Sequence, residues 1–415
     1  MIANDRAVIS ELARRYTEIA NMDVQNERRE LWSDLNSMKD RRVPVYVLDM
    51  VNVCHEVAPD SELKCEDPLL RDMERRLRLW LYRSELGDDC IVEPWISVDP
   101  DYTGGGANWQ NWGFEIQLER ISETLAYHLP EPPVKTKADL VKVVTGTGVI
   151  DEAKTREKVD RLTEAAGGAL EFFPCRYPPK ACGLSYSLAL LLGPERMMYQ
   201  FYDDPNMVRE LCKTISDASL AICDAAESAG NFTNRDSSSA DFPYIQAMPY
   251  SRELPNPGET RKVGMKEHWI FDAAQEFEGA GPDIFEEFLL AYQRPIYEKF
   301  GLTAYGCCEN LTKKIVHLKK IKNLRRVAVT PWANIEDCAR QLGDKYVISW
   351  RPNPSLMVSK GFDPDRVTRI VKNAKEIFDR YGCFWEVNLK DFITVERDRN
   401  RLANWVKAVR AALGQ

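Results

Sequence analysis

The segment RRVAVTPWANIEDCARQLGDKYVISW, residues 325–350, decides the fold class of this chain. RRVAVTP (325–331) and YVISW (346–350) are short, apolar and rich in β-branched residues, which predicts two buried strands. NIEDCARQLG (334–343) lies between them and predicts a helix. A helix that connects two consecutive strands is typical of parallel neighbours in one sheet. The segment therefore predicts a strand–helix–strand unit of the α/β class.

The same alternation continues on both sides of this segment. Strand-like LTAYGC (302–307) precedes helical 311–321, and helical 365–380 is followed by strand-like CFWEVNL (383–389) and then by helical 397–413. Four consecutive strand–helix units predict parallel strands with crossover helices. Upstream, VPVYVLD (43–49) and CIVEPWISV (90–98) predict two more strands, with a helix over 69–86 between them.

We therefore expect a TIM (β/α)8 barrel over residues 43–415, preceded by a helical cover over residues 1–42. An inserted loop or lid is expected around 99–135, where a triplet of glycines and two tryptophans follow one another: Gly104, Gly105, Gly106, Trp109 and Trp112. An open doubly wound sheet is the competing fold. It is disfavoured because no strand is followed by the GxGxxG pattern.

Composition excludes several function classes. The net charge is -8, so no broad basic surface is expected to attract nucleic acid or anionic lipid. No stretch approaches the roughly 20 apolar residues that span a bilayer. The N-terminus has no signal-peptide pattern, so we expect a cytoplasmic protein. The 11 cysteines include no CxxC pair, which leaves zinc ribbons and thioredoxin chemistry without support.

Chemistry in a parallel barrel is expected where strands end at their carboxyl side. That rule selects AYGCCEN (304–310), SWRPNP (349–354), EVNLKD (386–391) and HWIFDAAQEFEG (268–279). The adjacent Cys307 and Cys308 are compatible with metal ligands, a reactive thiol or core residues, whereas a disulfide between neighbours is strained. Two thiols followed by Glu309 suit zinc, although a strong zinc site needs three or four ligands.

Three stretches of the chain resemble a known family: YGCCENLTKKIVHLKKIKNLRRVAVTPWANIEDCARQLGDKYVISWRPNP, HWIFDAAQEFEGAGPDIFEEFLLAYQRPIYEKFGL and WEVNLKDFITVERD. They are similar to the uroporphyrinogen decarboxylase superfamily, and within it to the cobalamin-dependent methyltransferase branch. The resemblance is firm over residues 265–415 and implies a TIM barrel.

Zinc members of that branch carry a His-x-Cys pair after a late strand and a further cysteine after the last strand. Aligning Cys308 with the cysteine of the pair puts Gly306 at the histidine position, and aligning Cys307 puts Tyr305 there. The last strand ends in NLKD without a cysteine. The resemblance thus implies either an altered zinc set, for which Cys307, Cys308 and Glu309 are the expected ligands, or no zinc.

The resemblance implies transfer of a methyl group between a small methylated substrate, such as a methyl ether, and the cobalamin of a separate corrinoid protein. We expect Glu276 or His268 to donate a proton, with Tyr305 also at the catalytic centre. The expected substrate-binding residues are Trp269, Trp350, Gln275 and Asp391.

Two alternatives remain open at this point. One is a cofactor-independent decarboxylase of the uroporphyrinogen decarboxylase type, in which Arg351 would hold the substrate. The other is a non-catalytic barrel that only binds a ligand. The sequence does not set the oligomeric state, and a homodimer is one option.

Overall fold

The computed structural model describes most of the chain. The described residues are 3–103, 112–114, 116, 119–120, 127–128, 131–144, 149–176, 183–235, 245–258, 263–359 and 361–415. Much of the expected insertion over 99–135, including the glycine triplet and Trp109, lies outside them. Its described part contains a short antiparallel pair, β3 (Glu119–Arg120) with β4 (Tyr127–His128).

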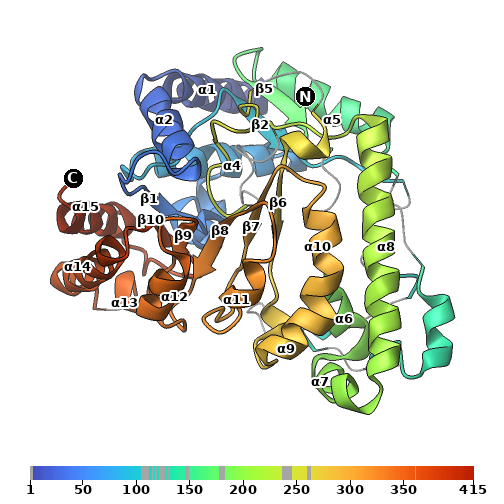
Figure 1. The fold of residues 1–415 in the computed structure, drawn as a ribbon. Coiled ribbons are helices and arrows are strands. Elements are labelled where there is room, and N and C mark those ends of the chain that lie inside the picture. The colour runs from blue at the N-terminus through green and yellow to red at the C-terminus, as the bar shows by residue number, and fades with distance from the viewer. Residues whose placement is uncertain are drawn as a thin grey trace.

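Six parallel strands form the main sheet, in the order β1-β10-β9-β8-β7-β6 (Figure 1). Their bounds are β1 Val45–Val47, β6 Trp269–Asp272, β7 Leu302–Tyr305, β8 Leu324–Val329, β9 Val347–Trp350 and β10 Phe384–Leu389. A separate parallel pair consists of β2 (Trp95–Val98) and β5 (Glu171–Pro174). Each of these strands except β5 and β6 overlaps a segment named above as strand-like, and β8 begins one residue before its segment.

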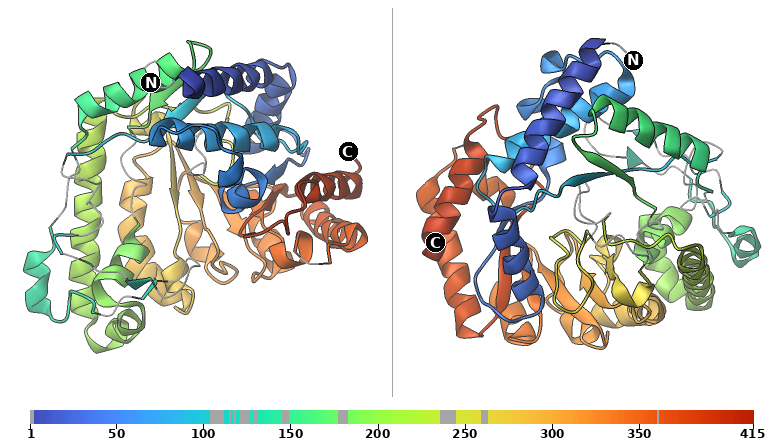
Figure 2. Two further views of the ribbon diagram at one scale, coloured as in Figure 1. Left: turned by 180° about the vertical axis from the view of Figure 1, so that it is seen from behind. Right: turned by 90° about the horizontal axis from the view of Figure 1, so that it is seen from above.

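Helices separate most of the consecutive strands. They are α1 Ala3–Ala20, α2 Val24–Asn36, α3 Cys54–Val57, α4 Pro68–Ser84, α5 Glu152–Ala165, α6 Leu184–Leu192, α7 Pro194–Asp203, α8 Pro205–Ala229, α9 Pro282–Phe285, α10 Ala291–Tyr297, α11 Ile315–Leu318, α12 Ile335–Leu342, α13 Pro354–Met357, α14 Pro364–Arg380 and α15 Arg401–Leu413. In Figures 1 and 2, α1 and α2 lie together at the side of the molecule where β1 and β2 are found. The domain boundary at residue 42 stays a prediction.

Side chains alternate between two faces of the main sheet. On one face Trp350 packs against Phe378 of α14 and against Trp385, with ring centroids 6.2 and 5.9 Å apart. Successive residues of a strand point to opposite faces, so Ser349 and Glu386 point away from this helix layer. We call that second side the inner face. It carries small and polar side chains: Ala304, Arg326, Ala328, Ser349, Glu386 and Asn388.

The side chains that follow β7 and β10 meet across the inner face of the sheet. Two strands separate β7 from β10, so their ends would lie about 14 Å apart in a flat sheet. Nevertheless Lys390, directly after β10, donates to Cys307, two residues after β7, across 2.7 Å. The described residues form one ladder of six strands and two ladders of two strands, not a ring of eight. The expected α/β class with a parallel sheet is confirmed, and barrel closure stays a prediction.

No helix in the described part of the chain is long and apolar enough to cross a membrane.

Candidate functional site

The carboxyl ends of three strands meet at a cluster of thiols and charged groups. Cys307 and Cys308 follow β7, Lys390 and Asp391 follow β10, and Arg351 follows β9. The loop after β7 can approach this point because Gly306 turns the chain at a φ of 101°, a conformation that favours glycine. We call Cys307, Cys308, Lys390, Asp391 and Arg351 the thiol–lysine cluster.

Lys390 binds both thiols. Its ammonium nitrogen lies 2.7 Å from the Cys307 sulfur and 3.2 Å from the Cys308 sulfur. The two sulfurs are 3.6 Å apart, and Cys308 also lies 3.3 Å from a carboxylate oxygen of Asp391. Gln246 donates its side-chain amide to Cys307 across 3.3 Å. Every polar neighbour of Cys307 named here is therefore a donor, which is the environment that a thiolate requires.

These contacts give the two thiols opposite acidities. The hydrogen bond from Cys308 and the positive charges of Lys390 and Arg351 outweigh burial and lower the pKa of Cys307 to about 5. The same hydrogen bond to Cys307, together with burial, raises the pKa of Cys308. At neutral pH the cluster therefore holds one thiolate, one thiol and one ammonium within hydrogen-bond distance of one another.

Glu309 does not point at the thiols. Its carboxylate accepts hydrogen bonds from the backbone N–H of Ala274 and from that of Cys307, both at 2.8 Å. The side chain is buried, and burial raises its pKa. Glu309 thus holds the loop after β7 against the loop after β6. Each of its carboxylate oxygens accepts one of these backbone hydrogen bonds.

The donor set does not fit a resident zinc ion. Lys390 places a positive charge against both sulfurs, which is where a divalent cation would have to bind. Glu309 faces backbone donors instead of the sulfurs. Among the described residues no group of three or more His, Cys, Asp or Glu side chains is arranged to hold a metal ion. An ammonium thus stands where the expected ligand set would place a metal.

Asp391 lies at the mouth of the cluster in a left-handed backbone conformation, with a φ of 61°. Its N–H donates to the carboxylate of Asp49, which follows β1. Burial raises the pKa of Asp49 to about 6. Asp391 was expected to contact substrate, and its half-exposed side chain beside Cys308 is compatible with that role.

The polar loop after β6 lies at this end of the sheet but faces other neighbours. Glu276 accepts a hydrogen bond from Ser185 of α6, and Gln275 is exposed. Asp272 accepts hydrogen bonds from Gln293 and Tyr297 on the helix side, at 2.8 Å each. The structure gives Gln275 and Glu276 no contact with the thiol–lysine cluster.

His268 lies at the opposite end of the strands. It directly precedes β6, and its ring nitrogens lie 2.7 Å from the Trp269 carbonyl and 3.0 Å from the Thr233 carbonyl. Trp269 is paired in register with Leu302, so Cys307 lies five residues further along the sheet direction. At 3.3 Å per residue this separation is about 17 Å. His268 and the thiols therefore do not converge as expected.

The three aromatic residues expected near the substrate are buried in the core. Trp350 packs between the sheet and α14, as described above. Tyr305 packs on the helix side, with its ring 6.1 Å from that of Tyr297. Trp269 is buried at the start of β6 and donates to the carbonyl of Pro249 across 2.8 Å.

Lys390 and Gln246, the two side chains that donate to Cys307, were not among the expected site residues. Lys390 is visible in the sequence as a strand-end charge, but nothing there shows that it meets Cys307. Gln246 carries no signal at all, because it comes from a loop and reaches the thiol through a backbone φ of 56°. Left-handed conformations at non-glycine residues cost energy and gather at functional sites. Gln246 and Asp391 both fit that pattern.

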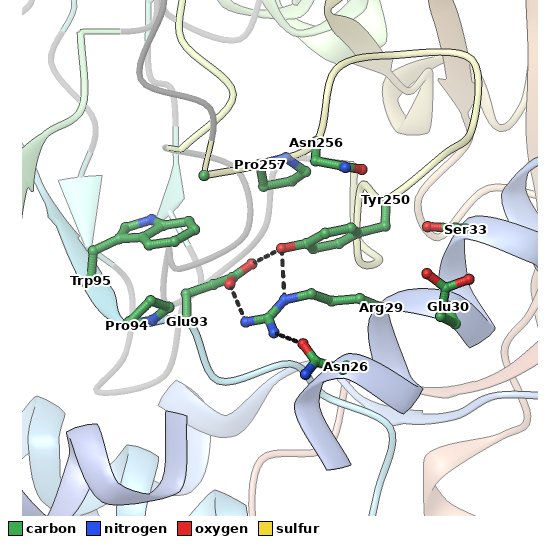
Figure 3. Close-up of a pocket in the computed structure, with 11 residues that line it drawn as sticks. Asn26, Arg29, Glu30, Ser33, Glu93, Pro94, Trp95, Tyr250, Asn256 and Pro257 are labelled. Atoms are coloured by element: carbon green, nitrogen blue, oxygen red, sulfur yellow. Dashed lines mark hydrogen bonds and ion pairs between the residues drawn. The ribbon is translucent and has the colours of Figure 1, made fainter. Parts of the chain in front are cut away.

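A cavity of about 540 Å³ lies at the other end of the strands (Figure 3). Figure 3 shows Arg29 of α2, Glu93 and Tyr250 pointing toward one another on its wall. Arg29 donates to Glu93 across 2.9 Å, and Tyr250 donates to Glu93 across 2.6 Å. Glu93 and Pro94 directly precede β2, so this cavity opens at an amino end. In parallel barrels that end serves stability, and the carboxyl end carries the chemistry.

Comparisons with known proteins bear on the fold. No protein-family model matches this chain, and no relative was found among curated proteins. Among solved structures the chain is similar to a methyltransferase from Methanosarcina mazei, with a TM-score of 0.56 and 11% sequence identity. The match covers 92% of this chain and 98% of that one. At this identity the likeness establishes a shared overall fold.

Proposed function

We propose that this protein is a methyltransferase that moves a methyl group between a small methylated substrate, a methyl ether foremost, and the cobalamin of a separate corrinoid protein. Three lines of support converge. The fold is similar to that of a protein named a methyltransferase. The sequence over 265–415 resembles the cobalamin-dependent branch. The thiol–lysine cluster lies at the carboxyl ends of the strands, where parallel α/β folds bind substrates.

The observation that carries the proposal is the contact of 2.7 Å between the Lys390 ammonium and the buried Cys307 thiolate. Demethylation of an ether leaves negative charge on oxygen, which must be neutralised as the bond to carbon breaks. Lys390 and the Cys308 thiol are the two proton sources at this point. Reduced cobalamin on the partner would supply the nucleophile.

The residues of this chain would perform three tasks. Lys390 donates a proton to the leaving oxygen, and Cys307 holds Lys390 in its charged form through the ion pair. Gln246 and Cys308 keep the Cys307 sulfur in place by hydrogen bonds. This assignment makes Lys390 the proton donor in place of Glu276 and His268, which were expected above. Neither of those two side chains lies at the thiol–lysine cluster.

The test is a methyl-transfer assay with a corrinoid protein, a reductant and a panel of methyl ethers, betaines and methyl thiols, followed through the cobalt spectrum. Lys390→Met should lower the rate by about a hundredfold, the size of a typical general-acid contribution. Lys322→Met is the matched control, since Lys322 is exposed and pairs with Glu298 at the surface. No change of the cobalt spectrum with any donor would overturn the proposal.

A decarboxylase of the uroporphyrinogen decarboxylase type is the second candidate. It is favoured by two buried cations at one site, Lys390 and Arg351, which suit a carboxylate substrate. Release of CO2 without corrinoid protein or reductant would establish this reading. Ligand binding with neither reaction would instead establish the non-catalytic barrel.

A further inference from the structure

One buried arginine has no carboxylate partner among the residues that the structure describes. Among the described residues four arginines are buried, and three of them form ion pairs with carboxylates: Arg83 with Asp88, Arg235 with Glu171 and Arg326 with Glu386. The fourth is Arg351, which is only 3% exposed. No carboxylate of the described residues lies within ion-pair distance of it.

The recorded contacts of Arg351 leave much of its guanidinium unused. One terminal nitrogen donates to the carbonyl of Cys307, and the Nε atom is buried without a partner. A guanidinium presents five donors in a planar fork that matches a carboxylate. The nearby Cys307 thiolate already pairs with Lys390 across 2.7 Å and makes no recorded hydrogen bond to the Arg351 guanidinium. The planar fork of Arg351 is therefore open to a carboxylate from outside the chain.

The surroundings of Arg351 independently indicate a polar ligand. Ser349 lies two residues earlier on the same face of β9, and its buried hydroxyl has no partner. Asn388 on the neighbouring strand β10 has a buried, unpartnered side-chain oxygen. Lys390 follows on the same face of β10. Native proteins rarely leave such groups unpaired in an apolar setting, so their gathering on one face marks a binding surface.

We propose that the substrate of the thiol–lysine cluster is a small methylated carboxylate, whose carboxylate binds Arg351 while its methyl group lies near Cys307 and Lys390. The inference rests on the proposed function for the methyl group alone. The carboxylate contact follows from Arg351 and holds whichever reaction occurs. Because Arg351 touches the Cys307 backbone, the carboxylate and the methyl group are a few atoms apart. The site therefore suits a compact ligand and not a polycarboxylate macrocycle.

The test compares two ligands that differ in charge and hardly in shape, methoxyacetate and methoxyacetamide. Their binding to the full-length protein is measured by calorimetry and by protection of Cys307 from iodoacetamide. The wild-type protein should bind the carboxylate at least tenfold more tightly than the amide. Arg351→Met should remove that preference, and Arg351→Lys should restore part of it. Arg340→Met, at an exposed arginine of α12 that pairs with Asp337, is the matched control.

Each outcome decides the matter. Equal binding of the two ligands by the wild-type protein, binding of neither, or an unchanged preference in Arg351→Met would overturn the carboxylate assignment. Failure of the proposed function looks different. In that case methoxyacetate binds with the predicted preference, but no methyl group reaches cobalt. Methyl transfer from neutral ethers alone would sustain the function and refute the substrate class.

Discussion

Replacing Lys390 by methionine should raise the pKa of Cys307 by about 2 units. Lys390 Nζ lies 2.7 Å from the Cys307 sulfur, and an opposite charge at such range shifts a pKa by about 1–3 units. The hydrogen bond from Cys308 is the larger cause of the low pKa and persists in the variant. The midpoint should therefore move from about 5 to roughly 7, a change of about 3 kcal/mol.

The assay is the pH dependence of alkylation by iodoacetamide, which reacts with the thiolate. Trypsin cleavage after Lys299 and Lys313 releases FGLTAYGCCENLTK, residues 300–313, in which Cys307 and Cys308 are the two cysteines. Tandem mass spectrometry then assigns the label to one sulfur. At pH 6 the variant should react about tenfold more slowly than the wild type, as a midpoint near 7 leaves about a tenth as thiolate.

The same ion pair should appear in stability measurements. A thiol whose folded-state pKa lies below its unfolded value stabilises the fold fully above about pH 8.5, and this contribution is lost as the pH falls through the folded pKa. Urea unfolding of the wild type should therefore show a loss from this group between about pH 8.5 and 5, and Lys390→Met should show a smaller one. Wild-type alkylation with an ordinary midpoint near 8.5 would refute this reasoning. So would a midpoint that is unchanged in the variant.

Three further outcomes are expected. Arg326→Met should lower the free energy of unfolding in urea by about 3–5 kcal/mol, because it leaves Glu386 buried without its cation. Adding Glu386→Leu should recover part of that loss. A loss below about 1 kcal/mol in the single variant, the size expected for an exposed ion pair, would contradict the burial argument. Gly306→Ala should cost about 1–3 kcal/mol by the same measurement and raise the alkylation midpoint of Cys307, since its methyl group would lie 2.6 Å from Leu311. Burial raises the pKa of Asp272 to about 7. The contribution of Asp272 to the free energy of unfolding therefore falls as the pH rises from about 4 to 7. Asp272→Asn should flatten that part of the plot of the free energy of unfolding against pH.

The architecture could be predicted from the sequence where the local signals were strong and mutually consistent. The strand–helix rhythm of the last third is reproduced, and Asp363 caps α14 through its side chain, with Pro364 at the first turn. The helix expected over 311–321 is shorter in the structure, at Ile315–Leu318. Lys314 explains part of the difference, because its buried side chain reaches the carbonyl of Phe277. A tertiary contact of that kind cannot be read from the hydrophobic periodicity of the sequence.

The site was harder to predict, because strand alternation fails where a chain leaves its strand. Alternation from Tyr305 would place Cys307 on the helix side. Gly306 turns the backbone with its left-handed φ, and the Cys307 sulfur meets Lys390 instead. Likewise Trp350 looked suitable as a pocket wall by its place at a strand end, whereas alternation assigns that place to Arg351. Only the position of α14 decides which of the two neighbours points inward.

The charges of the cluster connect its two proposed roles. Cys307 as a thiolate and a carboxylate bound at Arg351 would share two cations, Lys390 and Arg351, so each anion weakens the other's hold on them. Asp391 adds negative charge, but it is half exposed and therefore screened by water. Binding of an anionic substrate should thus favour proton uptake by the cluster. A proton taken up by Cys307 would add a further proton source beside Lys390 and the Cys308 thiol, so the same charge that identifies the substrate would also supply acid for its demethylation.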